Sequence, residues 1–408
     1  MTGFCVPGLG FIDLFGYLMQ NHRGGGCVPW VKPRRPPFTF RCITPDEAPR
    51  VHGTLSMKRL SASAHAKLKK GGVWIPSPLA LDGDKRPAEQ WQRLLTLYYI
   101  RAGARAVVPG AHTGEFSGGN LEIYRNWLHL IKEMVQEYGS KDMLLMSAVS
   151  GPQYMQQAEL AAAAGYDIVM LAPTAFTNCS DDEVVRIFRD VAGIIPVFGF
   201  ELQKLVPGSR EFNASLWERI FAIVYGAKAA PFNTYRAQVM LEAAAHSARR
   251  KDLVMVTGND DRIVADLGGC FPFKVGRRTV TMHYAGGLLG HFATDTHAAV
   301  GWAGAVLAGK QGKRWRLAVS EKELAHIVNM CNGALFDARM DFANSVWGVK
   351  YRLTSLGFLP GPYCFHENGR SGLAEEIDRA YGYHPVISDR AFVSENLASM
   401  KREVGLHP

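Results

Sequence analysis

Residues 72–76, GVWIP, form the first of eight short apolar runs that predict the fold of this chain. The other seven are AVVPG (106–110), MLLMSAV (143–149), DIVMLAP (167–173), IIPVFGF (194–200), FAIVYGAK (221–228), LVMVTG (253–258) and GLLGHFA (287–293). Amphipathic segments of helical length separate these runs, for example LEIYRNWLHLIKEMVQEYG after the second. Apolar strands that alternate with helices are typical of a parallel sheet.

Eight strand–helix units in succession favour an α/β fold of the (β/α)8 TIM-barrel type over residues 70–310. A doubly wound open sheet is the alternative, but no glycine-rich phosphate-binding turn follows the first run. Beyond residue 310, helical patterns predict an appendage over residues 311–395 that packs on the barrel. The insertion CFPFKVGRRTVTMHYAGG (270–287) predicts a small hairpin near the barrel mouth.

The basic charge of the chain is concentrated at its N-terminus. Residues 1–70 contain eleven Lys and Arg against three acidic residues, which is +8 of the formal charge of +9. The stretch GGGCVPWVKPRRPP (24–37) is too rich in Gly and Pro to pack as helix or sheet. Residues 1–58 are therefore predicted to be a basic, mostly disordered extension. It interleaves few aromatic residues with its charges, so we expect a solvated tail and no nucleic-acid binding.

The N-terminal stretch FCVPGLGFIDLFGYLM (4–19) is oily but is interrupted by Pro7 and Asp13, and no basic residue precedes it. It therefore predicts neither a secretory signal nor a membrane span. The chain has seven cysteines and no CxxC pair, which argues against a zinc site. We expect a cytoplasmic protein with reduced cysteines, without a metal or a membrane partner.

The sixth run continues as VYGAKAAPFNTY (224–235) and places a lysine at the end of a predicted strand. Alternation puts Val224, Gly226 and Lys228 on one face of this strand. If Val224 faces the packed interior, Lys228 does so too, and desolvation lowers the pKa of its amine and makes it a nucleophile. The alternative is that Lys228 extends to the rim or pairs with a carboxylate such as Glu201.

The turn after the second run, PGAHTGEF (109–116), combines small residues with His112, Thr113 and Glu115. The Thr113 hydroxyl and free backbone N–H groups in a tight turn through Gly114 suit an anionic carboxylate. An ordinary turn with a helix cap would use the same residue types. The hypothesis of a carboxylate site is strengthened because the turn lies across the predicted barrel mouth from Lys228.

In these motifs the chain resembles the dihydrodipicolinate synthase and N-acetylneuraminate lyase family over residues 70–380. The matching segments, in the family's order, are HTGE (112–115), AKAAPFN (227–233), TGNDD (257–261), GGLLGHFA (286–293) and FANSVWGVKYRLTSLGFLPG (342–361). The resemblance implies a TIM barrel whose Lys228 forms a Schiff base with a 2-oxo acid such as pyruvate. It further implies a lyase, an aldolase or a hydro-lyase, that needs no cofactor and assembles as a homo-oligomer, a tetramer or a dimer.

One departure from the family concerns proton transfer. The family's tyrosine relay falls on Phe200 here, and a phenyl ring cannot carry a proton. Glu201, His112 and His291 are the candidate replacements, although alternation turns Glu201 away from Phe200 and His291 could be a core residue. The predicted catalytic residues are Lys228, Glu201 and His112, and the predicted substrate contacts are Thr113, Gly114, Phe200 and His291.

Two further functions remain open at the level of sequence. A catalytically altered barrel could bind a 2-oxo acid without converting it, and the loss of the tyrosine relay at Phe200 favours this alternative. Metal-assisted chemistry could use His112, Glu115, His291 and Asp295 as ligands, whose types suit a divalent ion. These four residues come from only two loops, so we prefer the hypothesis of a lyase that forms a Schiff base on Lys228.

Overall fold

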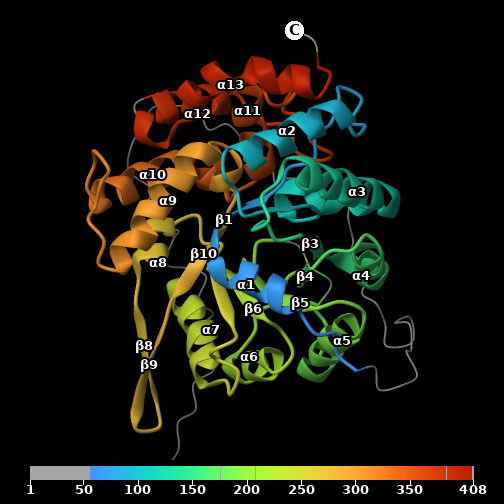
Figure 1. Cartoon of the computed structure of the whole chain (residues 1–408), viewed down its shortest axis with the longest axis vertical. Helices are drawn as coiled ribbons and strands as arrows, with labels where there is room; N and C mark the ends of the chain where they lie inside the picture. The colour runs from blue at the N-terminus through green and yellow to red at the C-terminus, as the bar shows by residue number, and fades with distance from the viewer. Residues whose placement is uncertain (1–55, 175, 207, 383, 407–408) are drawn as a thin grey trace, which may run out of the picture. The chain divides into compact units, whose positions relative to one another are not determined.

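A closed ring of eight parallel strands forms the centre of the computed structural model, which describes residues 56–406 except 175, 207 and 383 (Figure 1). The strand order is β2-β1-β10-β7-β6-β5-β4-β3, and a parallel bridge between Ala106 and Leu144 joins the two ends of the sheet. The predicted barrel is confirmed. The strands are β1 (Gly72–Pro76), β2 (Ala106–Val108), β3 (Met146–Val149), β4 (Ile168–Leu171), β5 (Val197–Leu202), β6 (Gly226–Ala230), β7 (Val254–Thr257) and β10 (Tyr284–Leu288).

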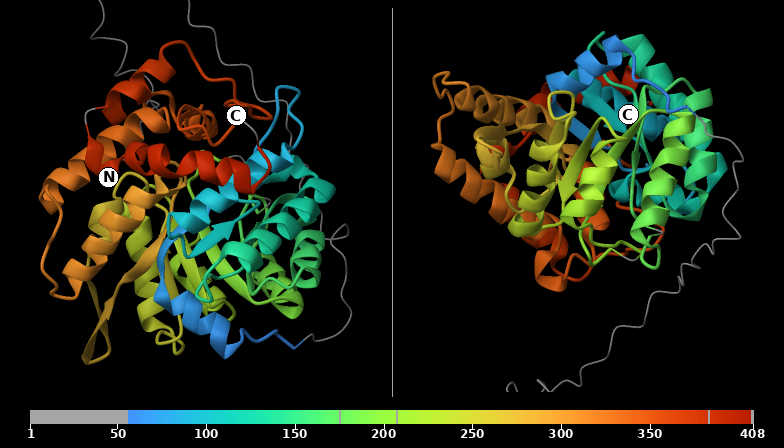
Figure 2. Two further views of the ribbon diagram at one scale, coloured as in Figure 1. Left: turned by 45° about the horizontal axis from the view of Figure 1, so that its top comes forward. Right: turned by 90° about the horizontal axis from the view of Figure 1, so that it is seen from below.

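Helices cover the outside of the ring, as both views of Figure 2 show. Each begins after a strand, and polar residues cap several of them; Ser180, for example, forms a capping box with Glu183 at the start of α5. The covering helices are α2 (Glu89–Arg101), α3 (Leu121–Tyr138), α4 (Tyr154–Ala163), α5 (Asp181–Ile194), α6 (Ala214–Phe221), α7 (Thr234–His246), α8 (Ile263–Gly268) and α9 (Thr296–Lys310). Short 3-10 turns occupy η1 (His112–Gly119), η2 (Gly151–Gln153) and η3 (His291–Ala293).

Apolar side chains form two layers, one inside the ring of strands and one on its outer face. The inner layer includes Trp74, Phe198 and Val256, and α1 (Ala62–Lys70) adds Ala64 and Leu68 to it from the N-terminal side of β1. The outer layer lies between strands and helices. Because successive residues of a strand point to opposite faces, the same strand supplies both layers. Polar side chains on the inner face near the C-terminal strand ends are therefore displayed toward one shared space.

Two predicted runs are shifted relative to the observed strands. Phe221 ends α6, so β6 begins only at Gly226, and Val224 packs in the outer layer rather than in the barrel interior. The last residues of the eighth run, from His291 to Ala293, form η3 instead of a strand. An apolar run indicates that a segment is buried, but its pattern alone does not distinguish a strand from a buried turn next to it.

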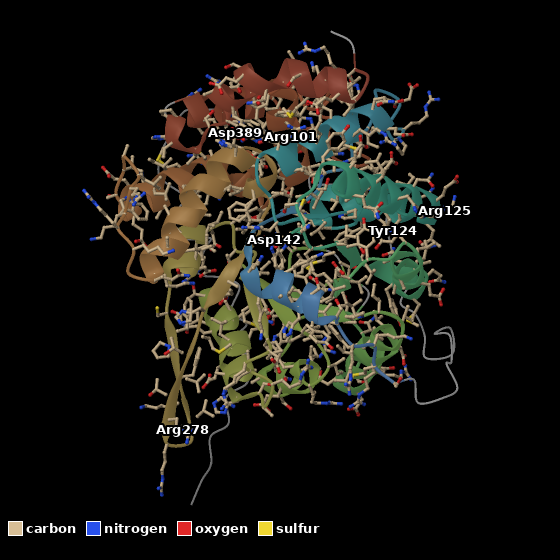
Figure 3. The ribbon with its side chains drawn as sticks, viewed as in Figure 1. Arg101, Tyr124, Arg125, Asp142, Arg278 and Asp389 are labelled. Carbon is tan, nitrogen blue, oxygen red and sulfur yellow. The ribbon has the colours of Figure 1, made fainter. Side chains whose placement is uncertain are left out.

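The predicted hairpin exists, but its expected place near the barrel mouth is wrong. It consists of β8 (Phe271–Val275) and β9 (Arg278–Met282), and it leads into the N-terminal end of β10, the end opposite the mouth. Phe273 and Val280 pack against the outer layer, and both strands contact α7. Arg278 lies near the far tip of the hairpin, away from the barrel (Figure 3).

The appendage consists of four helices and two 3-10 turns that follow α9: α10 (Glu321–Leu335), η4 (Ala338–Met340), α11 (Ser345–Ser355), α12 (Leu373–Gly382), η5 (Pro385–Ile387) and α13 (Arg390–Glu403). Two buried ion pairs connect α11 to the barrel. Lys350 Nζ lies 2.8 Å from Glu115 Oε2, and the Arg352 guanidinium donates to both oxygens of Asp295 at 2.6 and 2.9 Å. The appendage is thereby fixed on the loops that follow β2 and β10.

Breaking one of these pairs is expected to destabilise the fold strongly. Asp295→Asn leaves the Arg352 guanidinium buried without a counter-charge, so the free energy of unfolding should fall by about 3 to 5 kcal/mol. Denaturant unfolding followed by circular dichroism measures the change. The control is Asp84→Asn, since the Asp84–Arg86 pair is about 70% exposed on both sides, and a change within about 0.5 kcal/mol is expected there.

The predicted extension over residues 1–58 lies outside the described residues apart from 56–58. Within the part of the chain that the structure describes, no helix combines the length and the apolar character needed to span a membrane.

Candidate active site

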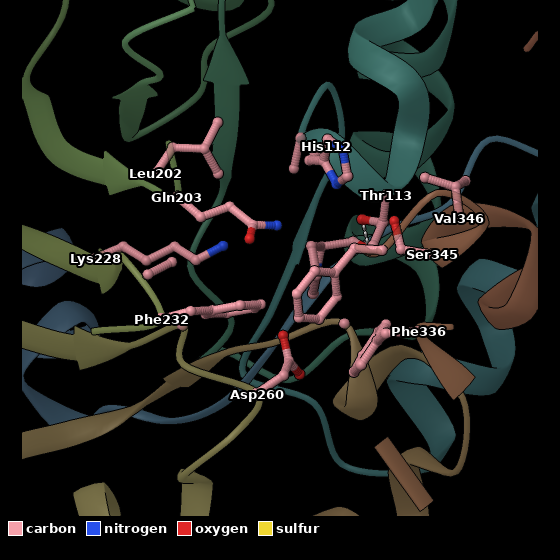
Figure 4. A pocket seen from close by; sticks show the side chains of 16 residues that line it. His112, Thr113, Leu202, Gln203, Lys228, Phe232, Asp260, Phe336, Ser345 and Val346 are labelled. Atoms are coloured by element: carbon pink, nitrogen blue, oxygen red, sulfur yellow. Dashed lines mark hydrogen bonds between the residues drawn. The ribbon is translucent and has the colours of Figure 1, made fainter. Parts of the chain in front are cut away.

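A cavity of about 60 Å³ opens where the C-terminal ends of the strands meet the appendage (Figure 4). A cavity needs about 10 to 15 Å³ for each water-sized molecule, so this one has room for a small ligand. The barrel supplies most of the wall, and the segment from the end of α10 to the start of α11 supplies the rest. The lining residues are Pro76, Ala111, His112, Thr113, Leu202, Gln203, Lys228, Ala230, Phe232, Gly258, Asp260, Gly290, Phe336, Phe342, Ser345 and Val346.

Lys228 is the third residue of β6 and points into this cavity. It pairs in register with Phe200 of β5 and Val256 of β7, and its side chain is 8% exposed. The Nζ atom lies 4.4 Å from the centre of the Phe200 ring, and no hydrogen bond or ion pair joins it to any described residue. Burial lowers the pKa of the amine.

A glycine beside Lys228 makes this placement possible. A Cβ atom on Gly258, at the end of β7, would come within 2.2 Å of Lys228 Cε. Lys228 faces inward as expected, but Val224 does not share its face, because Val224 precedes β6 and packs in the outer layer. Ala230, two residues after Lys228, does belong to the inner layer and shows the alternation that holds within the strand.

Asp260 faces the same cavity, although it is not among the site residues predicted from the sequence. It follows β7, is 8% exposed, and its Oδ1 accepts the backbone N–H of His291 at 3.1 Å. The Asn332 side chain holds the Asp260 backbone by donating to its carbonyl at 2.6 Å. Burial raises the pKa of the carboxyl group, while the hydrogen bond from the His291 backbone and then the charge of Lys228 lower it. Its position directly after a barrel strand was the signal that could have identified it.

The turn after β2 lies across the cavity from the lysine, as predicted (Figure 4). Thr113 Oγ1 donates to the carbonyl of Pro76 at 2.5 Å, so the hydroxyl keeps only acceptor capacity toward a ligand. The backbone N–H groups of His112 and Thr113 bond to no acceptor among the described residues. A Cβ atom on Gly114 would come within 2.5 Å of the Trp127 ring, so the turn requires glycine there.

His112 lines the cavity close to these N–H groups. Burial, and then the positive charge of Lys228, lower its pKa to about 4. The imidazole is therefore neutral near pH 7 and adds no charge to the site.

Glu201 does not lie in the cavity, which corrects its prediction as a catalytic residue. Its neighbour Phe200 faces inward, so Glu201 points outward, where it is 1% exposed. There the carboxylate accepts from Trp217 Nε1 at 3.1 Å and pairs with Arg236. These contacts hold α6 and α7 against β5 and leave Glu201 out of reach of the lysine.

His291 and Phe200 support the site from behind instead of lining the cavity. The His291 ring is fully buried, with Nδ1 2.6 Å from Asn332 Oδ1 and with Trp302 and Tyr381 as aromatic neighbours. Its contribution is the backbone N–H that Asp260 accepts. Phe200 supplies the ring beneath the amine of Lys228. Both therefore differ from their prediction as substrate contacts.

The four residues of the alternative metal site are not brought together. Glu115 pairs with Lys350 and accepts the backbone N–H of Phe365 at 2.8 Å, and Asp295 is bound by Arg352. Among the described residues, no cluster of three or more His, Cys, Asp or Glu side chains is suited to hold a metal ion.

The site thus consists of a buried lysine on β6 and a buried carboxyl group after the neighbouring strand β7, both lining one cavity at the mouth of a (β/α)8 barrel. No protein-family model and no curated protein matches the sequence. Solved structures do match: dihydrodipicolinate synthase from Bacteroides thetaiotaomicron has a TM-score of 0.62 at 16% identity, covering 77% of this chain and 98% of that one. YagE from Escherichia coli K12, of the dihydrodipicolinic acid synthase family and in complex with pyruvate, has a TM-score of 0.61 at 13% identity, covering 77% and 98%.

N-acetylneuraminate lyase from Mycoplasma synoviae matches with a TM-score of 0.59 at 13% identity, covering 78% of this chain and 98% of that one. The chain thus has the fold of dihydrodipicolinate synthase and N-acetylneuraminate lyase, which the motif order predicted. The match spans nearly the full length of each of these proteins.

Proposed function

We propose that this protein is a class I lyase of the dihydrodipicolinate synthase and N-acetylneuraminate lyase type that acts on a 2-oxo acid through a Schiff base on Lys228. The observation that carries the proposal is the amine itself. Lys228 is buried, faces a small cavity, has a lowered pKa and has no ion-pair partner among the described residues. A lysine in such surroundings is a nucleophile at neutral pH and does not stabilise the fold.

The proposed reaction begins when the Lys228 amine attacks the ketone carbon and water leaves, which gives a protonated imine. The imine withdraws electrons from the bond at the adjacent carbon, so that a carbon–carbon or carbon–oxygen bond there breaks or forms. Hydrolysis then returns the free amine and the product. The N–H groups of His112 and Thr113 are the proposed site of the substrate carboxylate.

We assign the proton transfers to Asp260. Its carboxyl group lines the same cavity as the lysine and its pKa is raised by burial, which allows it both to give and to accept a proton near neutral pH. Glu201 points away from the cavity, and the His291 ring lies behind it. In this proposal Asp260 carries the proton that a tyrosine hydroxyl would carry at the position of Phe200.

Reduction of the proposed imine with borohydride, which would leave a stable adduct on Lys228, tests this proposal. Reduction in the presence of pyruvate is expected to add one carboxyethyl group to Lys228, detected by intact mass and then by peptide mapping. A second candidate, a barrel that binds 2-oxo acids without converting them, is favoured by Phe200 at the relay position. In that case pyruvate would raise the melting temperature, and Lys228 would remain unmodified under saturating pyruvate.

The predicted homotetramer or dimer and the predicted cytoplasmic location stay predictions. The proposed chemistry requires neither a metal nor another cofactor.

A further inference from the structure

Two phenylalanines with left-handed backbone meet at the cavity. Phe232 follows β6 and has φ 49°, and Phe342 precedes α11 and has φ 64°. Their ring centres are 5.3 Å apart, although one residue comes from the barrel and the other from the appendage. Non-glycine residues rarely adopt this conformation, and it persists at ligand-binding positions where the surrounding structure enforces it.

The surroundings of Phe342 do enforce it. Asp337, also left-handed with φ 51°, is buried and accepts from Asn344 Nδ2 at 2.7 Å and from Arg370 Nε at 2.8 Å. Arg370 in turn pairs with Glu376 of α12 at 2.7 Å. The segment between α10 and α11 is thus fastened at both sides of Phe342.

A third phenylalanine closes this side of the cavity. Phe336 is nearly buried and rests against Gly290 at the end of the barrel, where a Cβ atom would come within 2.8 Å of its ring. Phe232, Phe336 and Phe342 together form an aromatic wall that lines the cavity along with Lys228 and Asp260. We call these three residues the aromatic wall.

The charges of the cavity set a second condition. Among its described lining residues, Lys228 is the one cation, and Asp260 is the one carboxylate. In the proposed reaction the positive charge of Lys228 is committed to the imine beside the substrate carboxylate. A second anionic group on the substrate would then face Asp260 and apolar rings without a counter-charge, which is costly in a buried site.

We propose that the 2-oxo acid for this site carries a short, uncharged, apolar substituent that packs against the aromatic wall, and that 2-oxo acids with a second carboxylate or a phosphate are excluded. The Gln203 amide, which points into the cavity in Figure 4, the Ser345 hydroxyl and the neutral His112 ring are uncharged polar groups of the cavity lining, and none of the three supplies a counter-charge for a second anion. This inference rests on the proposed function, since it concerns the substrate of the same lysine.

The test compares 2-oxopentanoate with 2-oxoglutarate, in which a carboxylate replaces the terminal methyl group, in borohydride trapping on the full-length protein. The half-saturating concentration of 2-oxopentanoate is expected to be at least tenfold lower. Phe342→Ala should raise that concentration about tenfold, and by a larger factor than it raises the value for pyruvate, which has no substituent to pack against the ring. Phe392→Ala is the matched control, because Phe392 is also half-buried in the appendage but stacks on His297 away from the cavity.

Equal or tighter trapping of 2-oxoglutarate would overturn the inference, and so would a Phe342→Ala variant that handles both acids like the native protein. If no acid is trapped, including pyruvate, the proposed function fails, but the inference can still be measured. A larger rise in melting temperature with 2-oxopentanoate than with 2-oxoglutarate would then support the apolar cavity without an imine, and the reverse order would refute it.

Discussion

Lys228→Met is expected to abolish adduct formation and to lower turnover by roughly 10⁴-fold or more, because a thioether cannot form the imine on which every later step depends. Turnover can be measured without the natural substrate, as the exchange of pyruvate methyl protons with deuterium oxide followed by NMR. Imine formation acidifies these protons. Exchange by the variant at the native rate would show that the lysine is not the nucleophile.

The same variant should remain folded, which separates a catalytic lysine from a structural one. Lys228 has no ion-pair partner among the described residues, and methionine has a similar length without a buried amine. The melting temperature at neutral pH should therefore equal or exceed that of the native protein, because an apolar group replaces a buried amine. Lys313→Met, at an exposed position, is the control and should change neither exchange nor stability.

The pH dependence of stability gives a further check with a defined sign. Folding lowers the pKa of Lys228 from its ordinary value of 10.5. At any pH between the folded-state and the unfolded-state pKa, the unfolded chain therefore binds more protons than the folded protein. The lysine therefore makes the free energy of unfolding rise with pH across that window. This contribution should disappear in Lys228→Met, and the control Lys313→Met should keep it.

Much of the fold is encoded locally and could be predicted. Eight apolar runs with helical patterns between them specify a parallel barrel, and its geometry brings the loops after β2 and β6 to one end. The sequence alone could therefore predict that Thr113 and Lys228 line one shared space. The hairpin was misplaced because a pattern predicts its strands but not the end of the barrel at which an insertion emerges.

Other parts of the site depend on contacts between distant segments. Phe336 and Phe342 reach the cavity because buried ion pairs and apolar packing hold the appendage on the barrel mouth, and nothing in their local sequence indicates this. Glu201 adjoins Phe200 in the chain, but strand alternation turns it outward. Asp260 shows the opposite case. Its position after β7 was available from the sequence, yet its role depends on burial and on facing Lys228.

Asp260→Asn is expected to separate imine formation from proton transfer. The amide cannot carry the proton, so the exchange of pyruvate methyl protons should fall by about 10²- to 10⁴-fold while borohydride still traps pyruvate on Lys228. The matched control is Asp261→Asn, the exposed neighbour, which should keep the native exchange rate. If His112 were the carrier instead, His112→Gln would lose the exchange and Asp260→Asn would keep it.

The variant also predicts a shift in the pH at which the adduct forms. The carboxylate of Asp260 favours the protonated amine, and its removal should lower the pKa of Lys228 further. The rate of trapping should then reach half its maximum at a lower pH than in the native protein. The native exchange rate should follow a bell-shaped pH profile whose two limbs belong to the coupled pair, and one limb should be lost in Asp260→Asn. A trapping profile that moves to higher pH, or does not move, would show that Asp260 and Lys228 do not share one electrostatic site.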